Sequence, residues 1–163
     1  MIELKELSQK DCNMIFSWIS NPELRKMTGT RGIPNIHSHA KWFDTKLNDK
    51  NNIIRMIVYE NVSVGIIGTN EINTIDNNAD IYLYIGNPLY RKKGIAFGAI
   101  NKLIELLVKK YNCHKITATI RSYNEPSINL FTKCGFICEG IQKDQILYDD
   151  VYYDRMLFGK ILD

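Results

Sequence analysis

Residues 80–100 read DIYLYIGNPLYRKKGIAFGAI and carry the chain from a strand pattern into a helix pattern. The first residues keep the two-residue period of a strand, and Gly86 followed by Asn87-Pro88 ends it. Beyond the cations, apolar residues with helical spacing form one face, at Ile100, Leu103, Ile104, Leu107 and Val108. The stretch therefore predicts a strand, a short loop and a long helix that ends near Tyr111.

The loop in this stretch has the properties of an anion-binding site. Small residues, Gly94, Ala96 and Gly98, stand at the start of the helix, where backbone N–H groups have no intrahelical partner and the helix dipole adds positive charge. Glycine lets a phosphate approach the backbone closely. Because the run Arg91-Lys92-Lys93 raises the local potential further, we expect a phosphate group to bind here.

The rest of the chain predicts a mixed sheet with helices on both faces. Strands are expected over residues 2–7, 53–59, 62–75, 79–86, 115–120, 136–147 and 151–158. Helices are expected over 11–20, capped by Asp11, over 38–47, opened by Ser38 or His39, and after Asn124. Asn21-Pro22 is expected to end the first helix, and TGTRGIPN (28–35) to form a loop. The resulting order, β-α-α-β-β-β-α-β-α-β-β, is that of an α/β (α+β) protein.

Bulk properties favour one domain over residues 1–163, because the chain contains no internal repeat and no linker-like tract. The formal net charge is +3 and shows no basic stripe, so we expect no nucleic-acid partner. The absence of a signal-peptide core and of a long apolar run predicts a cytoplasmic protein without membrane contact. The four cysteines match no zinc spacing, so we expect no metal.

Three segments together resemble the GNAT N-acetyltransferases. Arg91, Gly94 and Ala96 match the Arg-x-x-Gly-x-Ala motif with which that family holds the pyrophosphate of acetyl-CoA. Residues 124–136, NEPSINLFTKCGF, resemble its second coenzyme segment, and residues 139–162, EGIQKDQILYDDVYYDRMLFGKIL, resemble the closing hairpin of its RimJ/RimL and spermidine acetyltransferase branch. A P-loop or dinucleotide-binding fingerprint is absent.

The resemblance implies a single-domain GNAT fold, with a mixed seven-stranded sheet, helices on both faces and a splayed central strand pair. It implies acetyl-CoA as acetyl donor, an N-acetyltransferase activity and direct attack of an amine on the thioester. By analogy, the coenzyme contacts are the strand residues Tyr84 and Ile85, the loop and helix start Arg91, Lys92, Lys93, Gly94, Ile95, Ala96 and Phe97, and the second-segment residues Asn124 and Lys133.

Deprotonation of an amine with a pKa near 10 costs roughly 4–5 kcal/mol at neutral pH, so a general base is expected. Glu71, in GTNEINTID, resembles the Glu-Ile-Asn of the spermidine acetyltransferase branch and is the first candidate; Asp80 is the alternative. The family's general acid is a tyrosine in the second segment, and Phe131 stands at that position here. Two outcomes stay open: water protonates the thiolate, which is a good leaving group, or catalysis is slow or absent.

The acceptor is expected on the side formed by the N-terminal half, which carries Trp18, Asn21, Arg25, His37, His39 and Trp42. The sequence leaves open a polyamine, an amino-sugar nucleotide, a protein N-terminal α-amino group, or a non-catalytic acyl-CoA-binding role. A polyamine would need carboxylates around the cleft, whereas an amino-sugar nucleotide would need cations and an aromatic face. Homo-oligomers occur in this branch and are compatible with the sequence.

Overall fold

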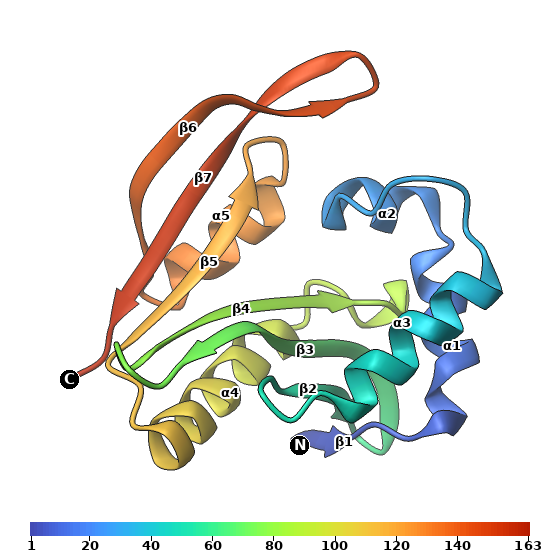
Figure 1. Cartoon of the computed structure of the whole chain (residues 1–163), viewed down its shortest axis with the longest axis horizontal. Helices are drawn as coiled ribbons and strands as arrows, with labels where there is room; N and C mark the ends of the chain where they lie inside the picture. Colours follow the sequence, from blue (N-terminus) through green and yellow to red (C-terminus); the bar gives the residue numbers. More distant parts are fainter.

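Seven strands form one sheet in the order β1-β2-β3-β4-β5-β7-β6 in the computed structural model, which describes residues 1–163 (Figure 1). The strands are β1 (Ile2–Glu6), β2 (Ile54–Tyr59), β3 (Val62–Asn73), β4 (Asn78–Ile85), β5 (Lys115–Arg121), β6 (Ile137–Tyr148) and β7 (Val151–Ile161). The helices are α1 (Cys12–Ile19), α2 (Pro22–Thr28), α3 (Ile36–Asn48), α4 (Ile95–Tyr111) and α5 (Glu125–Lys133). None of them combines the length and the apolar composition needed to span a bilayer.

The centre of the sheet opens into a V between β4 and β5, the only parallel neighbours (Figure 1). Their pairing covers Asn78 with Lys115, Ala79 with Ile116 and Asp80 with Thr117. Beyond Asp80 the two strands separate, so β4 has free backbone donors and acceptors on the side facing β5. The expected splayed central pair is thereby confirmed.

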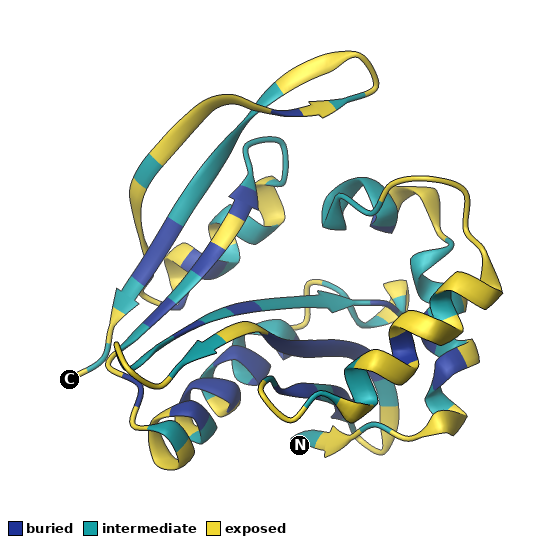
Figure 2. Ribbon diagram, in the orientation of Figure 1, coloured by how far each residue is buried: buried dark blue, intermediate teal, exposed yellow.

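Two hydrophobic cores lie on opposite faces of the sheet. The larger core packs α4 and α5 against the sheet through residues such as Ile67, Ile81 and Leu103. The smaller core packs α1 and α3 against the other face through Ile15, Phe43 and Ile66. Figure 2 shows the buried residues concentrated along β2, β3 and the inner side of α4. On α4, Ile100, Leu103, Ile104 and Leu107 are buried, as the helical spacing predicts. Val108, expected on the same face, is instead 42% exposed.

The N-terminal third differs from the sequence prediction. Helix α1 ends at Ile19, just before Asn21-Pro22, as expected. These two residues also begin α2, which was not predicted: the Asn21 side chain accepts from the N–H groups of Glu23 and Leu24, and Pro22 occupies the first turn. The same two residue types suit either role, because proline is tolerated at a helix start. Helix α3 begins at Ile36 with Asn35 as its cap, rather than at Ser38 or His39.

Asp11 was expected to cap α1 with its side chain and does not. Its carboxylate instead accepts from the Ser8 N–H at 2.8 Å and closes a capping box around the short 3-10 turn Gln9–Asp11. The Asn124 cap of α5 is confirmed, since its Oδ1 accepts from the Ser127 N–H at 3.2 Å. The elements from β2 to β7 agree with the expected order.

Candidate active site

A single large cleft of about 1390 Å³ passes through the V between β4 and β5. On one side of the sheet it is lined by the loop before α4 and by the start of α5. On the other side it is lined by α2, α3 and the segment that joins them. The cleft therefore connects the two faces of the sheet, and a molecule entering from either side meets the unpaired edge of β4.

The start of α4 forms a row of free backbone donors in this cleft. Lys92 and Gly94 have positive φ angles of 58° and 75°, and the first intrahelical hydrogen bond runs from the Gly98 N–H to the Gly94 carbonyl. The N–H groups of Ile95, Ala96 and Phe97 have no backbone partner, and no side chain caps the helix. A Cβ built at Gly94 would meet nothing within 4 Å. This geometry suits a bound anion, because the donors converge on open space.

The three cations beside this row have different partners. The Arg91 Nε–H donates to the Ile85 carbonyl at 3.3 Å, and its Nη1 lies 3.7 Å from the Glu23 carboxylate on α2. The Lys93 Nζ lies 5.2 Å from the centre of the Tyr90 ring. Lys92 is exposed. All three line the cleft, so the expected positive potential surrounds the free N–H groups.

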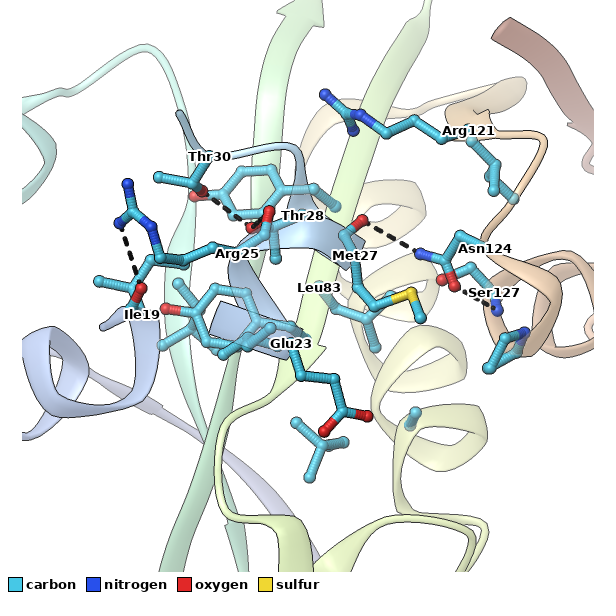
Figure 3. Close-up of a pocket in the computed structure, with 18 of the residues that line it drawn as sticks. Ile19, Glu23, Arg25, Met27, Thr28, Thr30, Leu83, Arg121, Asn124 and Ser127 are labelled. Atoms are coloured by element: carbon cyan, nitrogen blue, oxygen red, sulfur yellow. Dashed lines mark hydrogen bonds between the residues drawn. The ribbon is translucent and has the colours of Figure 1, made fainter. Parts of the chain in front are cut away.

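Helix α2 bridges the open side of the V and contacts the loop between β5 and α5. The Tyr123 hydroxyl donates to the Lys26 carbonyl at 2.7 Å. The Asn124 Nδ2 donates to the Met27 carbonyl at 3.2 Å, as Figure 3 shows. Burial raises the pKa of the Tyr123 phenol, so that it stays protonated as a donor. Asn124 thus caps α5 and holds α2 with the same amide. We call this contact the α2 latch.

Two predicted coenzyme residues on β4, Tyr84 and Ile85, line the cleft, whereas Lys133 does not. Lys133 lies on the last turn of α5, with its Nζ 5.4 Å from the centre of the Phe97 ring, which does line it. Tyr82 was not predicted as a site residue, although it lines the cleft from the same face of β4 as Tyr84. The Tyr82 hydroxyl is buried without a hydrogen-bond partner, and burial raises its pKa to about 12.

The two candidate bases are cross-strand neighbours at the apex of the V, where Glu71 of β3 pairs with Asp80 of β4. Asp80 accepts from the Asn70 Nδ2 and from the Thr117 hydroxyl, each at 2.8 Å, and so ties β3, β4 and β5 together. The Glu71 carboxylate is exposed and has no protein partner. Neither carboxylate lines the cleft itself.

Phe131, at the position of the family's tyrosine, lines the cleft but is 4% exposed. Its ring packs edge-on against Phe136 with the ring centres 5.0 Å apart. The side chain has no proton to donate, so a proton for a leaving group must come from elsewhere.

The expected acceptor-side residues divide into lining and structural groups. Arg25, His39 and Trp42 line the cleft. Trp18 packs its ring against Gly86, so closely that an added Cβ would clash with the indole, and Asn21 is the cap of α2.

Arg25 and His39 are themselves held in place. The Arg25 guanidinium donates to the Ile19 carbonyl at 3.3 Å (Figure 3). It also donates to the Arg31 carbonyl at 2.9 Å and to the Gly32 carbonyl. The His39 Nε2–H donates to the Cys12 carbonyl at 3.1 Å, and burial lowers the His39 pKa. Both side chains therefore shape the wall, whereas His37 is exposed and lies outside the lining.

The cleft carries more cations than the sequence led us to expect. In addition to the three loop cations, its lining includes Arg25, Arg31, Lys46, Arg121 and Arg155. The carboxylates among the lining residues are Glu23, which faces Arg91, and Glu125. Arg121 and Arg155 were not predicted. They lie on two different strands, and the alternation of polar and apolar residues in each strand does not show that the two side chains line the same cleft.

Comparisons with known proteins agree with this geometry. The model of the acetyltransferase (GNAT) domain matches residues 2–137. The SPbeta prophage-derived uncharacterized N-acetyltransferase YokL of Bacillus subtilis (strain 168) is 27% identical over 158 residues, which are 97% of this chain and 88% of YokL. The ribosomal protein uS5-alanine N-acetyltransferase of Escherichia coli (strain K12) is 28% identical over 95 residues, which are 56% of this chain and 49% of that enzyme.

Among solved structures, the spermidine N-acetyltransferase of Vibrio cholerae in complex with CoA and spermine has the same fold. It superposes with a TM-score of 0.89 at 20% identity, covering 98% of this chain and 95% of that one. The family match spans most of the chain, and the relatives are named as N-acetyltransferases. The chain therefore belongs to the GNAT family and is an N-acetyltransferase.

Proposed function

We propose that the protein transfers the acetyl group of acetyl-CoA to a primary amine of a small molecule, by direct attack of the amine in a ternary complex. The observation that carries this proposal is the single cleft that joins the free N–H groups of α4 to the space under α2 through the V. Donor and acceptor can enter such a cleft from opposite faces and meet at β4. Holding both reactants in one site lowers the entropic part of the barrier.

The coenzyme would use the backbone more than side chains. The N–H groups from Lys92 to Phe97 would bind the pyrophosphate, with the Lys92 and Lys93 side chains adding positive potential. The Arg91 N–H is not available for this role, because it donates to the Pro88 carbonyl. The unpaired edge of β4 near Tyr84 and Ile85 would hydrogen-bond the amides of the pantetheine arm, as a strand partner would. Asn124 and Lys133 would contact the coenzyme from α5.

In the chemical step, the neutral amine nitrogen attacks the thioester carbonyl carbon, the C–S bond breaks, and the bond electrons leave with the CoA sulfur. Glu71 would remove the amine proton through water, because its carboxylate is free, whereas both Asp80 oxygens already accept hydrogen bonds. Asp80 is the second candidate for this role. With Phe131 in place of a tyrosine, a water molecule would protonate the thiolate.

The proposal is tested by incubating the protein with acetyl-CoA and a panel of primary amines while free thiol is followed. We expect thiol release that depends on both an amine and the protein, with the acetylated amine identified by mass spectrometry. Tight CoA binding without amine-dependent thiol release would overturn the proposal and leave a binding role.

A second candidate is acetylation of a protein N-terminal α-amino group, which is favoured by the similarity to the uS5-alanine N-acetyltransferase. An α-amino group has a pKa near 8, so its deprotonation costs less than that of an alkylamine. Short peptides with free N-terminal alanine or serine belong in the same assay. Faster turnover of such peptides than of every small amine would favour this candidate.

A further inference from the structure

We propose that the acceptor amine carries a phosphate group and that Arg121 and Arg155 bind this phosphate. The inference rests on the proposed function, because it names the substrate class of the same site. It starts from two arginines that face the cleft from the far arm of the V, on β5 and β7.

The two arginines are directly opposite each other on neighbouring antiparallel strands, in the register Arg121 with Arg155. Successive residues of a strand point to opposite faces. Ile120 and Met156 belong to the core under α4 and α5, so Arg121 and Arg155 point to the face that carries α2. This is the acceptor side of the cleft, opposite the helix start that suits the coenzyme.

Neither arginine has a partner of opposite charge. No carboxylate lies within 4.0 Å of either guanidinium, and neither side chain forms a hydrogen bond with the protein, although the Arg121 Nε is buried. Like charges directly opposite in a sheet destabilise it, and a buried donor without an acceptor costs about 1–3 kcal/mol. An anion between the two guanidinium groups would remove the repulsion between them.

The position of Arg121 favours a ligand over a structural role. Its guanidinium lies against Gly29 at the C-terminal end of α2, so close that an added Cβ would be in contact with it. Figure 3 shows this side chain extended over the cleft toward Thr30, away from Asn124 and Ser127 of α5. A guanidinium in this position can present two parallel N–H groups to a phosphate, which is the geometry that favours arginine over lysine.

The positive charge of the acceptor side favours an acceptor that carries an anionic group over a polycation. Arg25, Arg31 and Lys46 line the same side, whereas Glu23 is already paired with Arg91 and Glu125 lies at the start of α5. A molecule with several ammonium groups would be repelled by this lining. A phosphorylated amine, or an amino sugar linked to a nucleoside diphosphate, would place its phosphate on the arginines and its amine toward the apex of the V.

Matched acceptors test this proposal without the need to know the natural substrate. The pairs are ethanolamine with O-phosphoethanolamine and glucosamine with glucosamine 6-phosphate, together with spermidine and a nucleoside-diphosphate amino sugar. Acetyl transfer is followed by thiol release, and binding to the CoA-saturated protein by calorimetry. We expect the phosphorylated member of each pair to have the lower KM and the lower Kd, by about 10- to 100-fold. Comparison of the sugar monophosphate with the nucleotide sugar identifies the source of the phosphate.

Variants assign the effect to the two arginines. Arg121→Gln and Arg155→Gln are expected to remove the preference for the phosphorylated member while Kd for CoA stays unchanged. Lys102→Gln, an equal change of charge at an exposed site on α4, is expected to keep the preference. Equal binding within each pair, or preferential use of spermidine, would overturn the inference while leaving the proposed acetyl transfer intact. Phosphate-dependent binding without any thiol release would instead refute the acetyl transfer and support the phosphate site.

Discussion

At Gly94 the backbone has a φ of 75°, and the space on the Cβ side is open. The first property favours glycine by conformation, and the second leaves room for a ligand. An added side chain would therefore have two separable effects, one on stability and one on coenzyme binding.

Gly94→Ala is expected to cost about 1 kcal/mol of unfolding free energy, because alanine is strained in the left-handed region. Gly94→Glu carries the same backbone cost and in addition places a carboxylate where the pyrophosphate should lie. We expect it to weaken CoA binding by orders of magnitude, and far more than Gly94→Ala does, as measured by calorimetry beside urea unfolding of each variant. Unchanged CoA affinity in Gly94→Glu would refute the placement of the pyrophosphate.

Glu71 and Asp80 can be separated by matched neutral substitutions. Glu71→Gln is expected to lower kcat by about 100-fold with little change in KM for acetyl-CoA, because loss of a general base slows the chemical step. Asp80→Asn is expected to lower kcat by less than tenfold, since an asparagine can keep both hydrogen bonds to Asn70 and Thr117. The reverse order of effects, measured in steady-state assays across a pH series, would assign the base to Asp80.

At the scale of elements, α2 depends on a contact made almost a hundred residues further along the chain. Its seven residues are too few to form a stable helix alone, so the cap at Asn21 and the α2 latch must hold it. The latch joins the two arms of the V without adding to either hydrophobic core.

Asn124→Asp separates the two functions of the Asn124 amide. An aspartate can still cap α5 through Ser127, but it cannot donate to the Met27 carbonyl. We expect backbone amide exchange in α2 to become about 3- to 10-fold faster, which corresponds to one lost hydrogen bond, while exchange in α5 stays the same. In Asn124→Ala, which removes both bonds, exchange in both helices should become faster. Unchanged exchange in α2 of either variant would mean that the latch does not stabilise this helix.

The sequence predicted the elements from β2 onward because each has a strong period and clear ends, as at the Asn124 cap of α5. It failed to predict α2, because Asn21-Pro22 fits a helix end as well as a helix start, and the contacts that decide between them come from Tyr123 and Asn124. The anion site before α4 was predictable, since its residues are consecutive. The pairing of Arg121 with Arg155 was not predictable, because it depends on the register between β5 and β7.

At the scale of the whole molecule, buried tyrosines on the acceptor face of β4 link folding stability to pH. Burial raises the pKa of Tyr82 to about 12, and burial also raises the pKa of Tyr84. A phenol in the unfolded chain has a pKa of about 10. Above pH 10 the unfolded state therefore loses its proton first, and the unfolding free energy falls as the pH rises.

Tyr82→Phe removes one of these groups. Between pH 10 and 11, the unfolding free energy of this variant, measured by urea unfolding, should fall less steeply than that of the unaltered protein. The two slopes should differ by up to about 1.4 kcal/mol per pH unit. At pH 7 the variant should be as stable as the unaltered protein or more stable, because the hydroxyl that it loses has no partner. Equal pH slopes in the two proteins would show that Tyr82 ionises with the same ease in both states.

The α2 latch has a consequence for how the acceptor preference of this fold can change. Both of its donors, Tyr123 and Asn124, bind main-chain carbonyls of α2 and not side chains. Any residue with a carbonyl satisfies them, so substitutions along α2 can alter the chemistry of the acceptor wall while the helix stays in place. Directed evolution of new amine substrates should therefore tolerate libraries at Met27 and Thr28 far better than libraries at Tyr123 and Asn124.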